Sequence, residues 1–597
     1  MTRTTGPGLF QPHTLALAVA VGFVAPAQAV NFNIGEIEGQ FDSSLSVGAS
    51  WSMRSPDRDL IGPNNGGQGQ AQTGDDGRLN FKKGETFSKI FKGIHDLELK
   101  YRDTGVFVRG KYWYDFELKD ESRLFKDIDD SNRKEGAQSS GAEILDAFLY
   151  HNYAIGDLPG TVRVGKQVVS WGESTFIGNS INAINPIDVA AFRRPGAEIK
   201  EGLIPVNMLY LSQSLTDQLS MEAFYQLEWD QTIIDNCGTF FSTADVAADG
   251  CDNGYHIGSP AIAPLQPVAA AFGQGFRVDS EGVILPRAGD RDARDSGQWG
   301  LALRWLGDET EYGAYFMNYH SRTPIVSTQN AGLATLAALP GIIGTAEGIA
   351  PGSGAGLAQS VMLGNGRYYL EYPEDIRLYG LSFSTTLPTG TAWAGEISYR
   401  PNLPLQINTT DMTLSLLNPI APGTAPVAAG PGQDNVGYRR KEVTQVQTTF
   451  THFFDQVMGA GRFTLVGEIG MAHVGGLESR EDLRYGRDSL FGAYGFRGDT
   501  HGFVTSTSWG YRVRGIWEYS NVFAGVNLKP NISWSHDVDG YGPNGLFNEG
   551  SKAVSFGVDA DYRNTYTASL SYTDFFGGDY NVAVDRDFLA LSFGVSF

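Results

Sequence analysis

The C-terminal segment constrains the fold of this chain more than any other. Residues 588–597 read F-L-A-L-S-F-G-V-S-F, and a large apolar side chain occupies every second position from Leu589 to Phe597. The positions between them hold Ala590, Ser592, Gly594 and Ser596. Because successive side chains of a strand point to opposite faces, this segment predicts a strand with one apolar face and one face of small, mostly polar residues.

A terminal phenylalanine on such a strand resembles the closing strand of bacterial outer-membrane barrels, which carries their assembly signal, so Phe597 is the predicted barrel-closing C-terminus. The N-terminus agrees, because residues 15–24 form an apolar run of ten and a small-x-small cleavage site follows at residues 27–29. This pattern is typical of a secretory signal peptide and is too short to span a bilayer. We therefore expect a signal peptide at residues 1–29 and a single barrel with long extracellular loops at residues 30–597, in the outer membrane of a Gram-negative bacterium.

The composition narrows the class of protein. Glycine accounts for 75 of the 597 residues, aromatic residues for 12 % and charged residues for 19 %, which suits a barrel with many turns and aromatic girdles. The formal net charge of −22 excludes a nucleic-acid partner, because such binding requires basic patches. Beyond the signal peptide no apolar run approaches the length of a membrane helix, and residues 333–349 predict a short loop helix.

The same alternation recurs along the chain and allows the strands to be counted. Residues 553–562 and 565–575 alternate on either side of Arg563-Asn564, which predicts a tight hairpin. Eight short and nine long connections alternate along the chain, as in barrels with short periplasmic turns and long outer loops. We predict an all-β, transmembrane antiparallel β-barrel of about eighteen strands, with about sixteen as the alternative. A soluble β-sandwich is the competing fold.

The connection after the fifth predicted strand differs from the other outer loops. Residues 172–202 carry several isoleucines, among them Ile177 and Ile181, and water gives such side chains no favourable environment. We expect this loop to fold inward as a constriction or hatch, with Asn185-Pro186 and Arg194-Pro195 as rigid corners.

Segments of this loop also resemble a known family. G-K-Q-V-V-S-W-G-E-S at residues 165–174, S-I-N-A-I-N-P-I-D at 180–188 and R-R-P-G-A-E at 193–198 are similar to signature segments of the Gram-negative outer-membrane β-barrel family catalogued as domain of unknown function 1302, as is D-D-G-R-L-N-F at 75–81. The resemblance implies transport near lipid, sterol or hydrocarbon metabolism. It also implies a periplasmic or lipoprotein partner and an inner-membrane resistance-nodulation-division permease. It supplies neither a substrate nor catalytic residues.

Functional residues must then be sought in the lumen, because a barrel of this size encloses an aqueous channel. The candidate residues of the inward-folded loop are Trp171, Glu173, Asn185, Asp188, Arg193, Arg194 and Glu198. The candidate lumen charges are Arg109, Lys111, Arg512, Arg514, Glu222 and Glu468. The plain interpretation of these charges is a self-neutralising polar lining. Arg193 and Arg194 either hold a carboxylate or phosphate head group bidentately or form structural ion pairs with lumen carboxylates.

The two cysteines, Cys237 and Cys251, lie within one polar stretch. In the oxidising compartment that secretion implies, we predict a disulfide that pins a surface loop, with free thiols as the alternative. A calcium site in this loop stays open as a further alternative, because four carboxylates flank the cysteines: Asp235, Asp245, Asp249 and Asp252. We assign no cofactor and no metal ligand from the sequence.

Two classes of function compete. The first is an outer-membrane channel for hydrophobic or amphipathic molecules (lipid, fatty acid, sterol or hydrocarbon-like), and its transport alternative is a substrate-specific hydrophilic porin. The second class is a non-transport surface or structural barrel. An enzyme is not expected, because no Gly-x-Ser-x-Gly motif stands out and only nine histidines are present to serve as a base. The expected partners are outer-membrane lipids, lipopolysaccharide and the barrel assembly machinery, with no nucleic acid.

Overall fold

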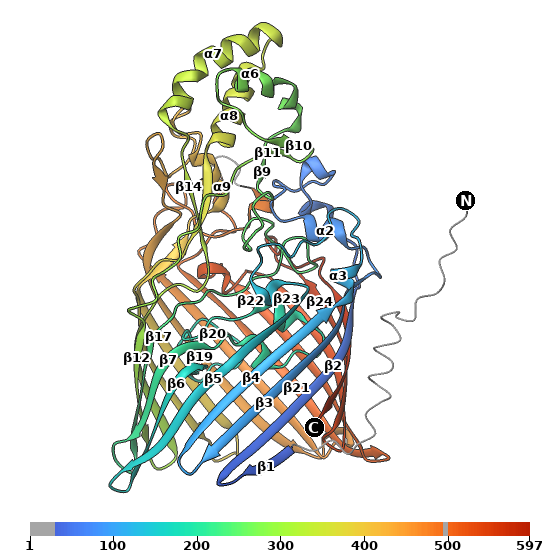
Figure 1. Ribbon diagram of the computed structural model, residues 1–597, viewed down its shortest axis with the longest axis vertical. Coiled ribbons are helices and arrows are strands. Elements are labelled where there is room, and N and C mark those ends of the chain that lie inside the picture. The colour runs from blue at the N-terminus through green and yellow to red at the C-terminus, as the bar shows by residue number, and fades with distance from the viewer. Residues whose placement is uncertain (1–29, 493–498) are drawn as a thin grey trace, which may run out of the picture.

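A computed structural model describes residues 30–492 and 499–597 (Figure 1). Within these residues eighteen antiparallel strands close into one barrel, and the last strand pairs with the first, from Ser44↔Ser596 to Ser52↔Phe588. The predicted count of eighteen strands is confirmed, whereas the predicted signal peptide at residues 1–29 lies outside the described residues. The barrel strands are β2 (Ile37–Ser52), β3 (Thr86–Tyr101), β4 (Thr104–Asp115), β5 (Ser140–Ile155), β6 (Leu158–Gln167), β7 (Val206–Ser214), β8 (Leu219–Gln226), β12 (Trp299–Leu306), β13 (Thr310–Tyr319), β16 (Ile376–Thr386), β17 (Ala392–Gln406), β19 (Tyr438–Asp455), β20 (Arg462–Gly475), β21 (Thr507–Phe523), β22 (Val526–Asp539), β23 (Lys552–Tyr562), β24 (Tyr566–Phe576) and β25 (Phe588–Ser596).

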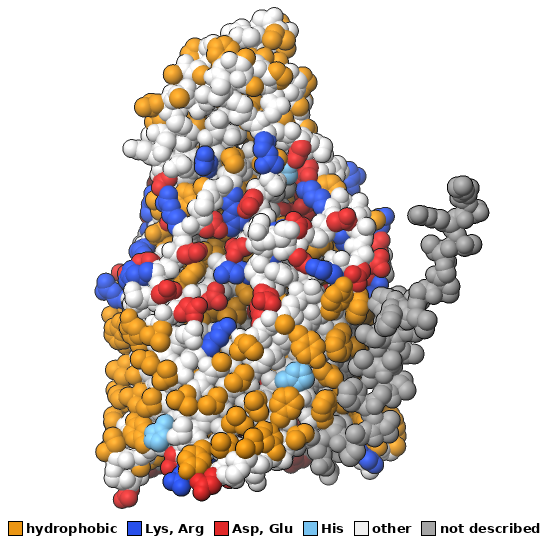
Figure 2. All heavy atoms as spheres, viewed as in Figure 1, with side chains coloured by type: hydrophobic (Ala, Val, Ile, Leu, Met, Phe, Trp, Pro, Cys, Tyr) orange, Lys and Arg blue, Asp and Glu red, His pale blue; other side chains and the backbone are white. Residues whose placement is uncertain are grey.

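The outer surface of the wall is an apolar belt. Phe556, Leu570 and Phe593 on adjacent strands are 53 %, 46 % and 52 % exposed. Figure 2 shows hydrophobic side chains covering the barrel below a band of charged residues. Because a continuous apolar belt of this extent is stable only against lipid, the barrel spans a membrane.

An additional short strand extends the seam of the barrel. β1 (Val30–Ile34) pairs with the start of β2, from Val30↔Phe41 to Ile34↔Ile37. Next to it, the backbone of Phe597 exchanges two hydrogen bonds with Ser43, at 2.6 and 2.8 Å. β1 has only five residues and was not predicted from the sequence.

Long loops form helices and short strands above one rim of the barrel, and we call this part of the molecule the tower. Tight turns join the barrel strands at the other rim (Figure 1). The tower has its own hydrophobic core, in which Leu339, Ile342, Leu357 and Val361 are buried. The predicted loop helix at residues 333–349 is present as α7. Among the described residues no helix is long and apolar enough to cross a membrane, a finding that concerns helices alone. The outer elements are α6 (Gln266–Ala271), α7 (Leu333–Ile349), α8 (Gly354–Asn365), α9 (Thr409–Ser415), β9 (His256–Ile257), β10 (Val278–Asp279), β11 (Gly282–Ile284), β14 (Ile325–Gln329), β15 (Arg367–Glu371) and β18 (Asp434–Asn435).

Four short helices lie in the loops nearer the wall. α2 (Asp76–Asn80) follows β2, and α3 (Phe116–Asp120) ends β4. α4 (Val189–Arg193) and α5 (Ile199–Gly202) belong to the connection between β6 and β7.

Candidate functional site

The inner loop, residues 168–205, connects β6 to β7 and lies inside the barrel. Its first part contacts β17, β19 and β20, of which β20 is eight strands from β6 around the wall. Its second part contacts β2, β3 and β4. The loop therefore crosses the lumen, and the predicted inward-folded loop after the fifth barrel strand is confirmed.

A buried carboxylate on β20 holds the tip of the inner loop. Glu468 is 1 % exposed, and its two oxygens accept hydrogen bonds from three successive backbone N–H groups: Thr175 at 2.9 Å, Phe176 at 2.6 Å and Ile177 at 2.7 Å. Hydrogen bonds to an ionised acceptor are roughly twice as strong as neutral ones. The predicted lumen charge Glu468 thus serves as an anchor for the loop.

A second carboxylate on β17 supports the same segment. Glu396 accepts hydrogen bonds from the backbone N–H groups of Glu173 and Ile181, at 2.5 and 3.3 Å. Its cross-strand neighbour Gln447 donates to the Ile177 carbonyl at 3.1 Å. The side chain of Glu173 is itself only half-buried. Gln447 was not assigned from the sequence, although its inward position opposite a carboxylate was a usable signal.

Some apolar residues of the inner loop fill one side of the lumen, whereas Ile187 and Ile199 are 38 % and 75 % exposed. Trp171 is 1 % exposed, and its ring centroid lies 5.1 Å from Phe224 and 5.8 Å from Tyr315. Ile181 packs into the same cluster, which inward-facing residues of β7, β8, β12, β13 and β16 complete. The indole nitrogen of Trp171 donates to Glu222 at 2.7 Å. This side of the barrel therefore contains a packed core.

Two buried lysines of the wall hold the second part of the loop. Lys111 on β4 lies 3.0 Å from the carboxylate of Asp188, which caps α4. Lys92 on β3 lies 2.7 Å from Glu201 in α5. All four side chains are almost fully buried, so each charge depends on its partner.

The two ends of the loop are tied together by one amide. Asn185 donates to the carbonyls of Gln167 and Ile204, at 3.2 and 2.9 Å. Glu198, by contrast, is exposed and receives a long hydrogen bond of 3.5 Å from Ser44 on β2. Asn185 is thus part of the scaffold, whereas Glu198 stays accessible.

Arg193 and Arg194 lie against aromatic rings. The Arg193 guanidinium is centred 4.5 Å from the ring of Phe241 and pairs with Asp235 at 3.0 Å. The Arg194 guanidinium is centred 4.3 Å from the ring of Trp113. The partner of Arg193 is a loop carboxylate rather than a carboxylate of the wall.

Both arginines line a cavity of about 70 Å³ between the inner loop, the β3–β4 wall and the cysteine loop, residues 235–251. We call this space the arginine cavity. Phe87 and Phe240 line it as well, and their rings stack with centroids 4.1 Å apart. The Phe240-Phe241 pair within a polar loop was a signal in the sequence that we did not use.

The wall from β22 to β25 is lined differently. Many of its inward-facing residues are small, polar and half-exposed, among them Ser533, Ser555 and Ser571, whereas Tyr315 and Leu378 on the opposite wall are buried. We call this half-exposed surface the polar lane. It lies away from the contacts of the inner loop tip.

The remaining predicted lumen charges do not converge on one site. Arg109 on β4 forms two hydrogen bonds to Asp96, at 2.7 and 2.8 Å. Arg512 on β21 pairs with Asp537 at 2.6 Å. The Nε atom of Arg514 is buried without a hydrogen-bond partner among the described residues. Most of this set is a self-neutralising lining.

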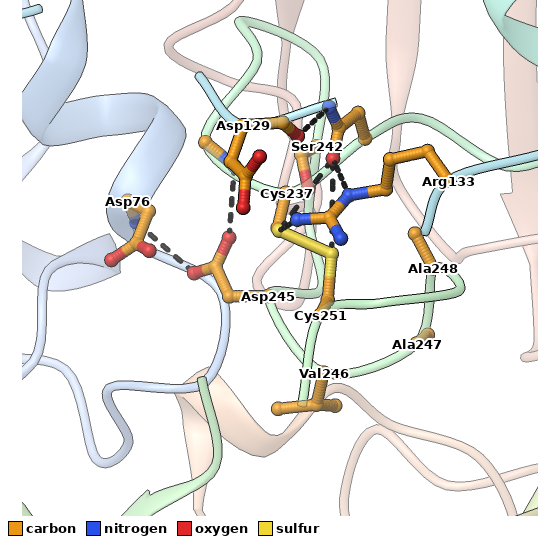
Figure 3. The surroundings of a disulfide bond; sticks show 12 residues. Asp76, Asp129, Arg133, Cys237, Ser242, Asp245, Val246, Ala247, Ala248 and Cys251 are labelled. Atoms are coloured by element: carbon orange, nitrogen blue, oxygen red, sulfur yellow. Dashed lines mark hydrogen bonds between the residues drawn. A yellow bond between two sulfur atoms is a disulfide. The ribbon is translucent and has the colours of Figure 1, made fainter. Parts of the chain in front are cut away.

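Cys237 and Cys251 are joined by a disulfide (Figure 3). The four aspartates around them are dispersed rather than gathered. Asp235 pairs with Arg193. Asp249 and Asp252 lie 3.9 and 3.6 Å from Arg287. Asp245 points to Asp76 of the first outer loop, residues 53–85, which connects β2 to β3.

A closed wall of eighteen strands, an apolar belt outside it and a loop folded across its lumen define a membrane-spanning β-barrel with an internal constriction. The family described as "Protein of unknown function (DUF1302)" matches residues 11–597, and the chain belongs to this family. The predicted resemblance is thereby confirmed.

Several solved structures are similar in overall arrangement. Acinetobacter baumannii OccAB1 is 9 % identical, with 96 % of this chain and 98 % of that chain covered and a TM-score of 0.40. Pseudomonas aeruginosa OccD3 (OpdP) is 9 % identical, with 96 % and 93 % covered and a TM-score of 0.38. The outer membrane channel DcaP of Acinetobacter baumannii is 10 % identical, with 95 % and 100 % covered and a TM-score of 0.33. No curated protein matches the sequence.

Proposed function

We propose that this protein is an outer-membrane channel for amphipathic anions, molecules with an apolar body and a carboxylate or phosphate head group. One observation carries the proposal: in the arginine cavity, Arg193 and Arg194 lie against aromatic rings at the edge of the inner loop. Guanidinium groups stacked in this way bind carboxylate and phosphate bidentately.

The size of the cavity suits a head group rather than a whole lipid. About 70 Å³ accommodates roughly five water molecules at about 15 Å³ each. A guanidinium has five N–H donors, so its ion pair with Asp235 leaves Arg193 able to bind a ligand. Burial raises the pKa of Asp235, although the neighbouring Arg193 acts to lower it.

The tip of the long outer loops favours a cargo with an apolar body. Residues 331–366 contain a single charged residue, Glu347, whose carboxylate accepts the N–H groups of Gly352 and Gly354 at 2.7 and 2.8 Å. Leu333 and Ile349 are 73 % and 63 % exposed there. Figure 2 shows no charged side chain on the visible face of the tip. An amphipathic molecule can contact this surface without desolvating a charge.

The test compares Arg193→Ala/Arg194→Ala with the matched control Arg439→Ala/Arg440→Ala, an exposed arginine pair on β19. Uptake into proteoliposomes is measured for a fluorescent long-chain carboxylate and for the corresponding neutral alcohol. Losing one charge-assisted contact of about 1.5–3 kcal/mol predicts at least a roughly tenfold loss of carboxylate uptake. The alcohol and the control variant should be unaffected. Unchanged carboxylate uptake in the Arg193/Arg194 variant would overturn the head-group site.

The polar lane favours the second candidate, a substrate-specific hydrophilic porin. Its serine-rich lining is half-exposed and offers hydrogen bonds to small hydrophilic solutes. Planar-bilayer recordings separate the two candidates. Steady ion conductance without added amphiphile favours the porin, and a closed barrel favours the amphipathic channel.

We also propose, from the family resemblance, that a periplasmic or lipoprotein partner and an inner-membrane resistance-nodulation-division permease work with this barrel. Crosslinking in cells, followed by purification of the barrel, tests this proposal. Recovery of the barrel without either partner would count against it.

A further inference from the structure

Three buried carboxylates meet where the first outer loop contacts the cysteine loop. Asp75, Asp76 and Asp245 are 0 %, 6 % and 1 % exposed, and each offers an oxygen within 4.8 Å of the oxygens of the other two. The backbone N–H of Asp76 also donates to Asp245 at 3.1 Å (Figure 3). The cluster thus joins the D-D-G-R-L-N-F segment to the disulfide loop.

An unpartnered oxygen distinguishes this cluster from an ordinary hydrogen-bonded network. The Oδ2 atom of Asp75 accepts hydrogen bonds from Gly62 and Asn65, at 2.8 and 3.0 Å. Its Oδ1 atom is fully buried and finds no donor among the described residues. A buried carboxylate oxygen without a donor or a cation is costly, so it indicates a missing ligand.

The balance of charge points to a cation. Glu281 is also buried, and Lys126 lies 2.9 Å from Asp76 and 2.7 Å from Glu281. Among the described residues these four carboxylates therefore pair with one ammonium group, whose side chain is 36 % exposed, and with His256, which lies 3.7 Å from Glu281. One divalent ion would remove most of the excess negative charge.

We infer that Asp75, Asp76 and Asp245 form a calcium site that fastens the first outer loop to the cysteine loop. Calcium binds oxygen at about 2.3–2.6 Å, so one ion can contact oxygens up to about 5 Å apart, whereas magnesium reaches only about 4.2 Å. Asp75, Asp76 and Asp245 are all buried, which leaves little room for the several waters that magnesium keeps, so the site favours calcium. The fastened cysteine loop supplies Asp235 and Phe240 to the arginine cavity, so the ion stabilises one wall of that cavity.

Calorimetric titration with calcium chloride tests the site in the full chain, refolded in detergent without lipopolysaccharide and treated with chelator. We expect one ion per chain with a Kd of about 10⁻⁴–10⁻³ M or tighter, and weaker binding of magnesium. Asp75→Asn and Asp245→Asn should each weaken binding at least about tenfold, since each removes a charged ligand. Asp249→Asn, in the same loop but paired with Arg287, should bind like the unmodified chain.

Lys126→Gln provides a test of opposite sign. Removing the competing ammonium should tighten calcium binding, whereas a purely structural acidic cluster would gain nothing from calcium. The inference is overturned if no saturable binding at one ion per chain occurs, if Asp75→Asn and Asp245→Asn bind normally, or if Asp249→Asn loses affinity equally. Heat-modifiable migration verifies that each barrel is folded, and Asp245→Asn and Lys126→Gln carry the test if Asp75→Asn does not fold.

Discussion

Replacing Glu468 should release the tip of the inner loop and open the barrel. Glu468→Ala removes the acceptor of three backbone N–H groups, at residues 175–177. Each hydrogen bond to a charged group contributes about 1.5–3 kcal/mol. Bonds that share one carboxylate are not additive, so we take about 3 kcal/mol for the loss of anchoring.

This free energy sets the size of the effect. About 3 kcal/mol corresponds to a change of roughly 150-fold in the ratio of detached to anchored tip. Glu468→Gln keeps one carbonyl acceptor without the charge, so its effect should be smaller, near 1 kcal/mol or about fivefold. We therefore expect the detached tip to be most populated in Glu468→Ala, less populated in Glu468→Gln and least populated in the unmodified chain.

Single-channel recording in planar bilayers measures the effect as longer or larger openings. The matched control is Asp559→Asn, which removes an inward-facing carboxylate that accepts hydrogen bonds from Asn531 and Ser569 of the wall. The reasoning is refuted if folded Glu468→Ala barrels conduct like Asp559→Asn and the unmodified chain.

Three further predictions concern stability. Cys237→Ser removes a disulfide whose cysteines are 14 residues apart. The lost constraint of about 3 kcal/mol should speed proteolysis of the cysteine loop while the barrel stays folded. Cleavage of the variant at the same rate as the unmodified chain would contradict this prediction. Lys92→Met leaves the carboxylate of Glu201 buried without its cationic partner, at a cost of about 3–5 kcal/mol. The temperature of unfolding in detergent should therefore fall. The double variant Lys92→Met/Glu201→Leu should recover most of the lost stability. Burial raises the pKa of Asp76 to about 8 and of Asp245 to about 6, from an ordinary value of 3.8. At a pH between about 4 and 8 these two carboxyl groups bind more protons in the folded loops than in the unfolded loops. Without divalent cations, the stability of the folded loops should therefore decrease as the pH rises from about 4 to about 8. Hydrogen-exchange protection of these loops that rises with pH over this range would contradict the raised pKa values of Asp76 and Asp245.

The barrel could be predicted because each strand carries its own signal. Alternation of side chains is a local property, so residues 588–597 indicate a strand and its two faces without knowledge of any neighbour. β1 escaped prediction because five residues, V-N-F-N-I, are too few to establish a pattern. The inner loop was predictable in direction from its isoleucines, of which Ile177, Ile181 and Ile184 are buried, but its anchors were not.

The anchors depend on contacts between distant parts of the chain. Glu468 meets residues 175–177 across a separation of more than 290 positions, and nothing near Glu468 in the sequence marks it as an acceptor for backbone N–H groups. The arginine cavity likewise combines Phe87, Arg193 and Phe240 from three separate segments. Arg193 could be named from the sequence, but its aromatic neighbour and its partner Asp235 could not.

The sequence by itself determined a membrane β-barrel, its eighteen strands and a loop that folds inward, because these follow from periodicity and from the free energy of apolar side chains in water. Only the tertiary structure decided which side of the lumen is packed, where Arg193 and Arg194 lie, and that Asp245 joins Asp75 and Asp76 rather than the aspartates near it in sequence. The physical reason is that closure of the barrel brings the loops after β2, β6 and β8 together, and electrostatic and hydrogen-bonded sites form from whichever charges that closure makes neighbours.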